Sequence, residues 1–247
     1  MSRQHRPAQT SRQVKAEQTR RRRRRTGAGW GLIVGAIALA CLVYQLLGFI
    51  KPDFSHPPHA SAGDLGIYVN QVSQPSHEVV IYSDYSCVGC VDPMIEFYES
   101  VTLDASGVGV QVEIRDINGP EGDPAAQAIA RRSAIAAACA DSTLDYGFFM
   151  RLLYYHQYEL NSQNLREIVN IISASDAAVS AYQTCYDTDA TAAFVDQVDQ
   201  AARASGRQIV DWPVFLLDGQ DITAQIRTET GQLDEDAARA LVGLPEQ

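Results

Sequence analysis

The chain has 247 residues, 46% of them apolar, which suffices for one domain of about 200 residues plus a short additional segment but excludes two large domains. Its net charge of −10 hides a sharp division. Residues 1–51 carry 11 of the 20 Lys and Arg and one acid, a net +10, whereas residues 52–247 carry 9 Arg and 29 acids, a net −20. Because so acidic a body would be repelled by phosphate backbones, we do not expect nucleic-acid binding, despite six consecutive arginines at 20–25.

The N-terminal region has the pattern of a membrane anchor. No charged residue occurs from Gly27 to Ile50, and residues 30–50 are nearly all apolar. A helix of this length spans roughly 30 Å, the thickness of the hydrocarbon core of a bilayer. The arginines precede this segment and only Lys51 follows it, so the positive-inside rule predicts a single-pass protein of the cell membrane with a cytoplasmic N-terminus and an extracytoplasmic body. The predicted parts are a basic disordered cytoplasmic tail (1–26), a transmembrane helix (27–51) in contact with the lipid bilayer through residues 30–50, a linker (52–63) and a globular domain (64–247).

Three alternatives to this anchor remain. A signal peptide cleaved at Ala60-Ser61-Ala62 would have too long an apolar core, which ends about ten residues before that site. A lipoprotein acylated at Cys41 would not need the apolar residues that follow. A buried helix of a soluble protein would not need the preceding arginines. The first two alternatives still place the body outside the cytoplasm and change only its anchoring.

The first part of the body alternates between strand and helix patterns. Residues 77–85 are β-branched and aromatic and predict a buried strand, and residues 108–117 alternate apolar and polar side chains, as a second strand would. A helical stretch from Cys87 to about Ser100 separates them. A strand, a helix and a strand in this order predict a parallel pair with a right-handed crossover.

A block of helices follows. Asp123-Pro124 is typical of a helix start, an N-cap followed by proline at the first helical position, and Gly206 is typical of a helix end. The predicted helices cover about residues 124–140, 145–158, 162–174, 176–186 and 190–205. The chain closes with a strand over 214–217, a hairpin turn at Asp218-Gly219 and a helix over 233–243. We therefore predict an α/β fold with an all-helical insertion at about residues 122–205.

Five cysteines occur, and one of them, Cys41, lies in the predicted membrane segment. The even number that remains suggests two pairs in an oxidising compartment. Cys87 and Cys90 form the first pair because they are close in sequence, which leaves Cys139 for Cys185. A structural disulfide between these two would stabilise the fold by about 4 kcal/mol through the entropy of the unfolded chain. Two unpaired buried thiols are the alternative.

A Cys-x-x-Cys pair where a strand meets a helix has a known chemistry. The helix N-terminus stabilises the thiolate of the first cysteine, which is the attacking species in disulfide exchange. The second cysteine, one turn inside, resolves the mixed disulfide. Half of a zinc site is an alternative, but no further Cys or His pair would complete it, and we expect no metal or cofactor. An inert structural bridge is the other alternative.

The segment Tyr82-Ser83-Asp84-Tyr85-Ser86-Cys87-Val88-Gly89-Cys90, the helical insertion and the late Trp212-Pro213-Val214-Phe215 together resemble the DsbA-like thioredoxin-fold family over about residues 65–245. The resemblance implies a thioredoxin fold with an inserted all-helical subdomain and catalytic roles for Cys87 and Cys90. It also implies that Pro213 is cis and faces the dithiol. The substrate groove would then be lined by Trp212, Pro213, Val88 and Gly89. A trans proline at the start of a strand is the alternative for Pro213.

The sequence departs from the family in three places. Val88-Gly89 stands where strong oxidases carry Pro-His, and Trp212 stands where Thr or Val is usual. Ile81 occupies a position that often holds a buried acid. Asp84 is the nearest acid and a possible proton relay, although a surface or capping carboxylate is the alternative. His156 is a candidate base, but a helix histidine satisfied by its neighbours is the favoured interpretation.

The leading functional hypothesis is an oxidase that donates the Cys87–Cys90 disulfide to unfolded or reduced secreted proteins. A membrane redox partner that recycles the dithiol is implied by the family. A reductase or isomerase, for example in cytochrome maturation, is the first alternative. A non-catalytic, membrane-anchored binding module with the same fold is the second.

Overall fold

The computed structural model describes residues 53–172, 175–206, 209 and 212–245. Within these ranges no helix is both long and apolar enough to cross a bilayer. The predicted tail over 1–26 and the predicted transmembrane helix over 27–51 lie outside the described residues. They therefore stay predictions.

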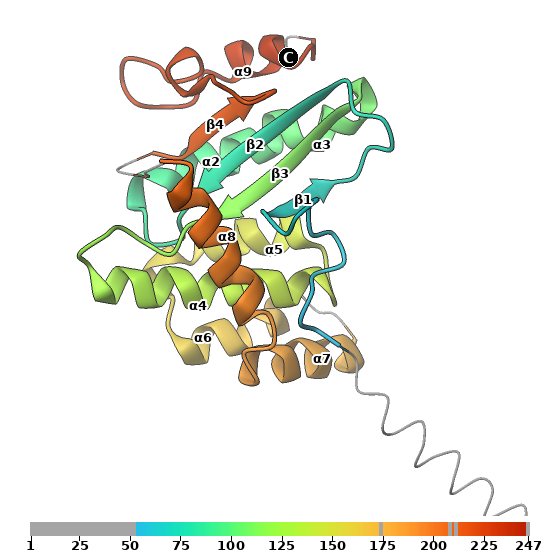
Figure 1. Ribbon diagram of the computed structural model, residues 1–247, viewed down its shortest axis with the longest axis vertical. Helices are drawn as coiled ribbons and strands as arrows, with labels where there is room; N and C mark the ends of the chain where they lie inside the picture. The colour runs from blue at the N-terminus through green and yellow to red at the C-terminus, as the bar shows by residue number, and fades with distance from the viewer. Residues whose placement is uncertain (1–52, 173–174, 207–208, 210–211, 246–247) are drawn as a thin grey trace, which may run out of the picture. The chain divides into compact units, whose positions relative to one another are not determined.

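One mixed sheet of five strands organises the described residues, in the order β1-β3-β2-β4-β5 (Figure 1). Strands β2 and β3 are parallel along their whole length, as the sequence predicted, and every other neighbouring pair is antiparallel. The strands are β1 Ile67–Asn70, β2 His77–Ser83, β3 Val110–Asp116, β4 Val214–Leu217 and β5 Gln220–Asp221. The central strand β2 is buried from Val79 onward, which explains why its sequence is a continuous apolar run without alternation.

The helical stretch after Cys87 is longer than predicted. It opens with a 3-10 turn, Val88–Cys90, and continues as α2 (Val91–Phe97), a π-helical turn (Tyr98–Thr102), α3 (Leu103–Ala105) and a last 3-10 turn (Ser106–Val108). The predicted end near Ser100 is wrong. Val101 and Ala105 are buried and continue the apolar face of the helix, and the chain leaves it only at Gly109, which takes the left-handed conformation with φ 78°.

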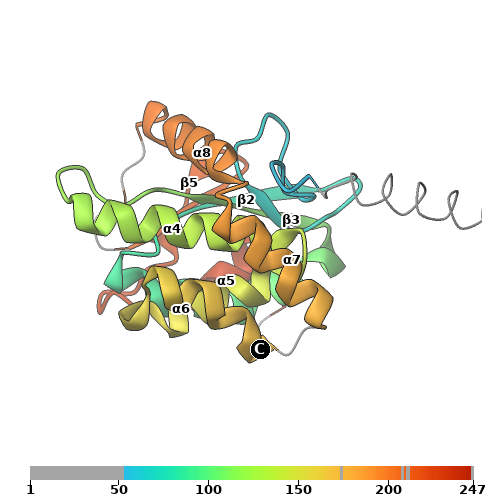
Figure 2. The same ribbon diagram turned by 90° about the horizontal axis from the view of Figure 1, so that it is seen from below.

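The insertion consists of helices that lie together beside the sheet (Figure 2). Asp123 caps the first helix, because its carboxylate accepts hydrogen bonds from the N–H groups of Ala125 and Ala126, as predicted. The helices are α4 Pro124–Asp141, α5 Tyr146–Tyr155, α6 Ser162–Glu167, α7 Asp176–Asp187 and α8 Ala192–Ala204. Short 3-10 turns follow α5 and α6, at Gln157–Glu159 and Ile168–Ile172.

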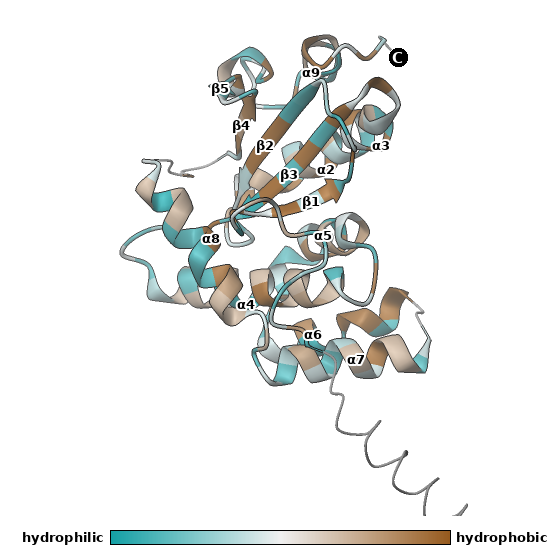
Figure 3. Ribbon diagram, turned by 45° about the vertical axis from the view of Figure 1, so that its right-hand side comes forward, coloured by the Kyte–Doolittle hydropathy of each residue, from teal (hydrophilic) through white to brown (hydrophobic). Residues whose placement is uncertain are grey.

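Helices cover both faces of the sheet. Helix α8 packs against β3 and α4, and in Figure 1 it runs from the lower ends of the strands across the front of α4, whereas α2 and α3 lie behind the strands. The closing helix α9, Glu235–Leu241, packs against α2 and the π-helical turn. Figure 3 shows hydrophobic residues on the strands between these layers, and Val79, Ile81 and Phe215 are among the fully buried ones. Burial of this apolar surface is the main favourable contribution to folding.

The described part of the predicted linker, residues 53–63, is docked on the domain. Ala60 forms an isolated bridge with Ile67, and the Ser61 hydroxyl donates to the buried Glu113 carboxylate at 2.6 Å. The backbone N–H of His59 and its ring Nδ1 both contact the carboxylate of Asp141 at the end of α4. This stretch is therefore part of the folded unit and not an extended spacer.

Candidate dithiol site

Cys87 and Cys90 are joined by a disulfide where β2 gives way to the first helical turn. Cys87 is the N-cap of this turn, with an extended backbone, and its carbonyl accepts a hydrogen bond from the N–H of Cys90 at 3.1 Å. Cys87 is 9% exposed and Cys90 is fully buried, while Val88 between them is 58% exposed. Of the two sulfur-bearing residues, only Cys87 therefore keeps some exposed surface, and Cys90 is shielded.

The start of this helix can stabilise a thiolate. Neither the 3-10 turn nor α2 has a side chain hydrogen-bonded at its N-cap. The N–H groups of a helix's first turn and the positive end of its dipole lower the pKa of a cysteine placed there. Once the disulfide is reduced, the Cys87 sulfur is the group that occupies this place.

Asp84 shapes the turn that leads to Cys87. Its buried carboxylate accepts hydrogen bonds from the N–H and the hydroxyl of Ser86, both at 2.7 Å, and its carbonyl accepts from the N–H of Cys87 at 3.0 Å. Burial raises the pKa of Asp84. These are the contacts of a capping carboxylate, and the proton-relay role of Asp84 stays a prediction.

A second buried acid, Asp116, lies at the end of β3, directly opposite Ser83 in the parallel register. It accepts hydrogen bonds from the Ser83 hydroxyl at 2.6 Å and from the Tyr146 hydroxyl of α5 at 3.3 Å. Burial raises the pKa of Asp116 to about 6. The sequence analysis did not single out this acid. A signal was present, because β2 and β3 were predicted to be parallel, so residues at their C-terminal ends should lie at the same edge of the sheet.

The helical insertion also contacts the loop of the dithiol. The Tyr154 ring of α5 packs against Tyr85 with a centroid distance of 5.1 Å. Just beyond α5, the Gln157 amide donates to the carbonyls of Tyr85, at 2.9 Å, and of Cys87, at 2.8 Å. Nothing in the local sequence pattern singled out Gln157.

Comparisons with known protein families and with curated protein sequences find no match. Solved structures do match. The MdbA thiol-disulfide oxidoreductase of Actinomyces oris superposes with a TM-score of 0.53 at 15% identity, over 76% of this chain and 91% of that one. The thiol-disulfide exchange protein α-DsbA2 of Wolbachia pipientis gives 0.52 at 15% identity, over 72% and 86%. MdbA of Corynebacterium matruchotii gives 0.51 at 21% identity, over 66% and 84%.

The chain has the DsbA-like thioredoxin fold. At 15–21% identity the likeness concerns the fold, which confirms the thioredoxin architecture with a helical insertion expected from the sequence.

The late proline of this DsbA-like fold precedes β4. Val214 pairs with Tyr82, so Pro213 lies at the end of the sheet from which the chain leads to Cys87. The described residues contain no cis peptide bond, so the Trp212–Pro213 bond is trans and the cis proline implied by the resemblance is wrong for this structure.

The Trp212 indole does not line a groove. It is 5% exposed, and its Nε1 donates to the carbonyl of Gly231 at 3.0 Å. Its ring packs against Phe215, with centroids 5.5 Å apart, and the Arg227 guanidinium lies 5.3 Å from the ring centre. Of the predicted groove residues, Val88 and Gly89 are exposed, and Pro213 is buried.

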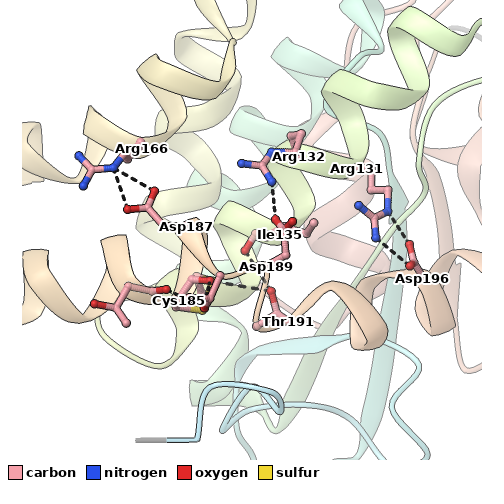
Figure 4. Close-up of polar contacts among 12 residues, drawn as sticks. Arg131, Arg132, Ile135, Arg166, Cys185, Asp187, Asp189, Thr191 and Asp196 are labelled. Atoms are coloured by element: carbon pink, nitrogen blue, oxygen red, sulfur yellow. Dashed lines mark hydrogen bonds and ion pairs between the residues drawn. A yellow bond between two sulfur atoms is a disulfide. The ribbon is translucent and has the colours of Figure 1, made fainter. Parts of the chain in front are cut away.

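The second disulfide of the DsbA-like fold joins Cys139 of α4 to Cys185 of α7, both fully buried. The Thr191 hydroxyl lies 3.7 Å from the Cys139 sulfur. Figure 4 shows Arg–Asp pairs across the helices around this bridge: Arg131 with Asp196, Arg132 with Asp189, and Arg166 with Asp187. Because both cysteines are fully buried, other thiols cannot reach this disulfide. Its position is that of a structural disulfide that links two helices of the insertion.

His156 ends α5 and is part-exposed. Its ring Nδ1 lies 3.3 Å from the Glu159 carboxylate, three residues on. This is the satisfied helix histidine favoured above. Within the described ranges, no three His, Cys, Asp or Glu side chains gather as a metal ion would require.

Proposed function

We propose that this protein is an extracytoplasmic thiol–disulfide oxidoreductase, and specifically an oxidase that donates the Cys87–Cys90 disulfide to reduced secreted proteins. The observation that carries the proposal is the Cys87–Cys90 pair at a helix N-terminus, with Cys87 9% exposed and Cys90 fully buried. The DsbA-like fold supports the same reaction class by analogy.

The proposed reaction is a two-step exchange. A substrate thiolate attacks the Cys87 sulfur, the Cys87–Cys90 bond breaks, and Cys90 leaves as a thiolate that takes up a proton. A second thiolate of the substrate then attacks the substrate sulfur of the mixed disulfide and releases Cys87 as a thiolate. The substrate loses two electrons, which the enzyme dithiol gains. The stability of the Cys87 thiolate at the helix N-terminus favours this direction.

The extracytoplasmic location rests on two independent features. Residues 1–51 combine a basic stretch with the apolar segment 30–50, which is the pattern of a single-pass anchor. The body carries a second, fully buried disulfide, and such bonds form and persist in oxidising compartments. A membrane redox partner would reoxidise the dithiol after each turnover.

One observation favours a second candidate, a reductase or isomerase. The exposed Val88-Gly89 dipeptide carries no polar or charged side chain that could stabilise the Cys87 thiolate further. A less stable thiolate gives the disulfide a lower reduction potential and turns the exchange toward reduction.

The deciding experiment equilibrates the full-length protein, in detergent micelles, with glutathione buffers of defined ratio. Alkylation and mass spectrometry then follow Cys87 and Cys90 separately from the buried pair. A potential near roughly −120 mV supports the oxidase, whereas one near about −270 mV supports the reductase. A Cys87–Cys90 pair that does not equilibrate at all refutes both assignments and leaves an inert bridge.

A further inference from the structure

A single side chain of the helical insertion holds the backbone on both sides of Ser86. Gln157 lies in the turn Gln157–Glu159, directly after α5. Its Nε2 donates to the carbonyls of Tyr85 and Cys87, at 2.9 and 2.8 Å. Because the Cys87 carbonyl also accepts the N–H of Cys90, the amide is linked through one oxygen atom to both cysteines.

The chemistry of this contact depends on the two N–H donors of Gln157. The side chain is buried, and its Oε1 is buried without a hydrogen-bond partner among the residues that the structure describes. An unmet buried acceptor costs free energy, which an apolar side chain of the same length would avoid. Packing alone therefore does not account for an amide here, whereas the two occupied donors do.

We propose that Gln157 is a positioning residue for the thiol–disulfide exchange, one that holds Cys87 at the helix N-terminus after the disulfide is reduced. The inference rests on the proposed function. In the oxidised protein, the disulfide itself ties Cys87 to the helix. When that bond opens, Cys87 has an extended backbone outside the helix, and the Gln157 amide keeps the Tyr85 and Cys87 carbonyls in place. The Cys87 thiolate then stays beside the N–H groups that stabilise it.

Loss of the amide should therefore act on the reduced form more than on the oxidised form. The thiol pKa of Cys87 should rise, and the reduction potential should fall. A tenfold change in the glutathione equilibrium, which is about 30 mV, corresponds to the net contribution of one such hydrogen bond. The charged groups near this loop are Asp84 before it, Asp92 in the first turn of α2, and His156 and Glu159 on the insertion, and none of them is altered in the test.

The test compares two variants that remove both donors without adding a charge: Gln157→Met, which keeps the length of the side chain, and Gln157→Leu, which shortens it. The matched control is Gln163→Met, at an exposed glutamine of α6 whose amide contacts only a surface carboxylate among the described residues. All variants are made in the full-length chain. Three quantities are measured: the Cys87 pKa from thiolate absorbance against pH, the potential in glutathione buffers, and the melting temperature of each redox form.

The expected result is a raised Cys87 pKa and a glutathione equilibrium shifted about tenfold in both Gln157 variants, with Gln163→Met unchanged. If one variant does not fold, the other decides. Equal destabilisation of the oxidised and reduced forms, with an unchanged potential, would show a merely structural role and overturn the inference. A wild-type dithiol that fails to equilibrate would instead overturn the proposed function, so the two failures are distinguishable.

Discussion

Asp116 should make the stability of this protein fall as the pH rises through about 6. Burial raises the pKa of its carboxyl to about 6, whereas an aspartate in an unfolded chain titrates near 3.9. The folded protein therefore binds this proton more tightly than the unfolded chain does. Its contribution to stability is fully present below about pH 4 and is lost as the pH rises past the folded pKa. Two pKa units correspond to about 3 kcal/mol.

The perturbation is Asp116→Asn, which abolishes the titration and keeps the local hydrogen bonds. The asparagine oxygen can still accept from the Ser83 hydroxyl, and its amide can donate to the Tyr146 oxygen. Above pH 7 the variant should gain up to about 3 kcal/mol relative to the wild type, and this advantage should vanish near pH 4.

Urea denaturation of the oxidised proteins from pH 4 to 8 measures this difference directly. Subtracting the two curves cancels the titration of all other groups. Glu229→Gln, at an exposed position, controls for the loss of one negative charge. A difference between wild type and Asp116→Asn that stays constant over the whole pH range would refute the reasoning, since Asp116 would then not titrate near 6.

Two further predictions concern the insertion. In Gly147→Ala the new Cβ would lie 2.5 Å from the Tyr98 ring, so urea titration should show a loss of about 1–3 kcal/mol, whereas Gly107→Ala, in open space, should cost nothing measurable. Replacing Cys139 and Cys185 together by serine should lower the free energy of unfolding by about 4 kcal/mol and leave the Cys87–Cys90 potential in glutathione buffers unchanged; a shifted potential would contradict the structural role.

The elements that the sequence predicted well are those whose signal is local. The apolar run of β2, the alternation of β3 and the Asp123 cap are each set by neighbours in the chain. Strand β1 was missed because four residues with a register irregularity carry almost no periodic signal, and they form a strand only through pairing with β3.

The same difference between local and tertiary signals explains which site residues could be predicted from the sequence. The Cys87–Cys90 pair can be recognised from its two-residue spacer in the sequence, because both cysteines lie in one helical turn. Asp116 of β3 bonds Ser83 at the end of β2, and Gln157 of the insertion bonds the Cys87 carbonyl, and only the tertiary fold makes these contacts. The environment of Trp212 was predicted wrongly for the same reason, since its partners Gly231 and Phe215 are set by the packing of the C-terminal segment.

Helix α5 and the turn that follows it contact both Asp116 and Cys87. This helix supplies the Tyr146 hydroxyl to Asp116, and the turn after it supplies the Gln157 amide to Cys87. Its approach depends on Gly147, where a side chain would collide with Tyr98. A displacement of α5 should therefore disturb the protonation of Asp116 and the position of Cys87 together. The insertion therefore contacts the loop of the Cys87–Cys90 pair, and we expect a change in its packing on the sheet to shift the Cys87–Cys90 potential.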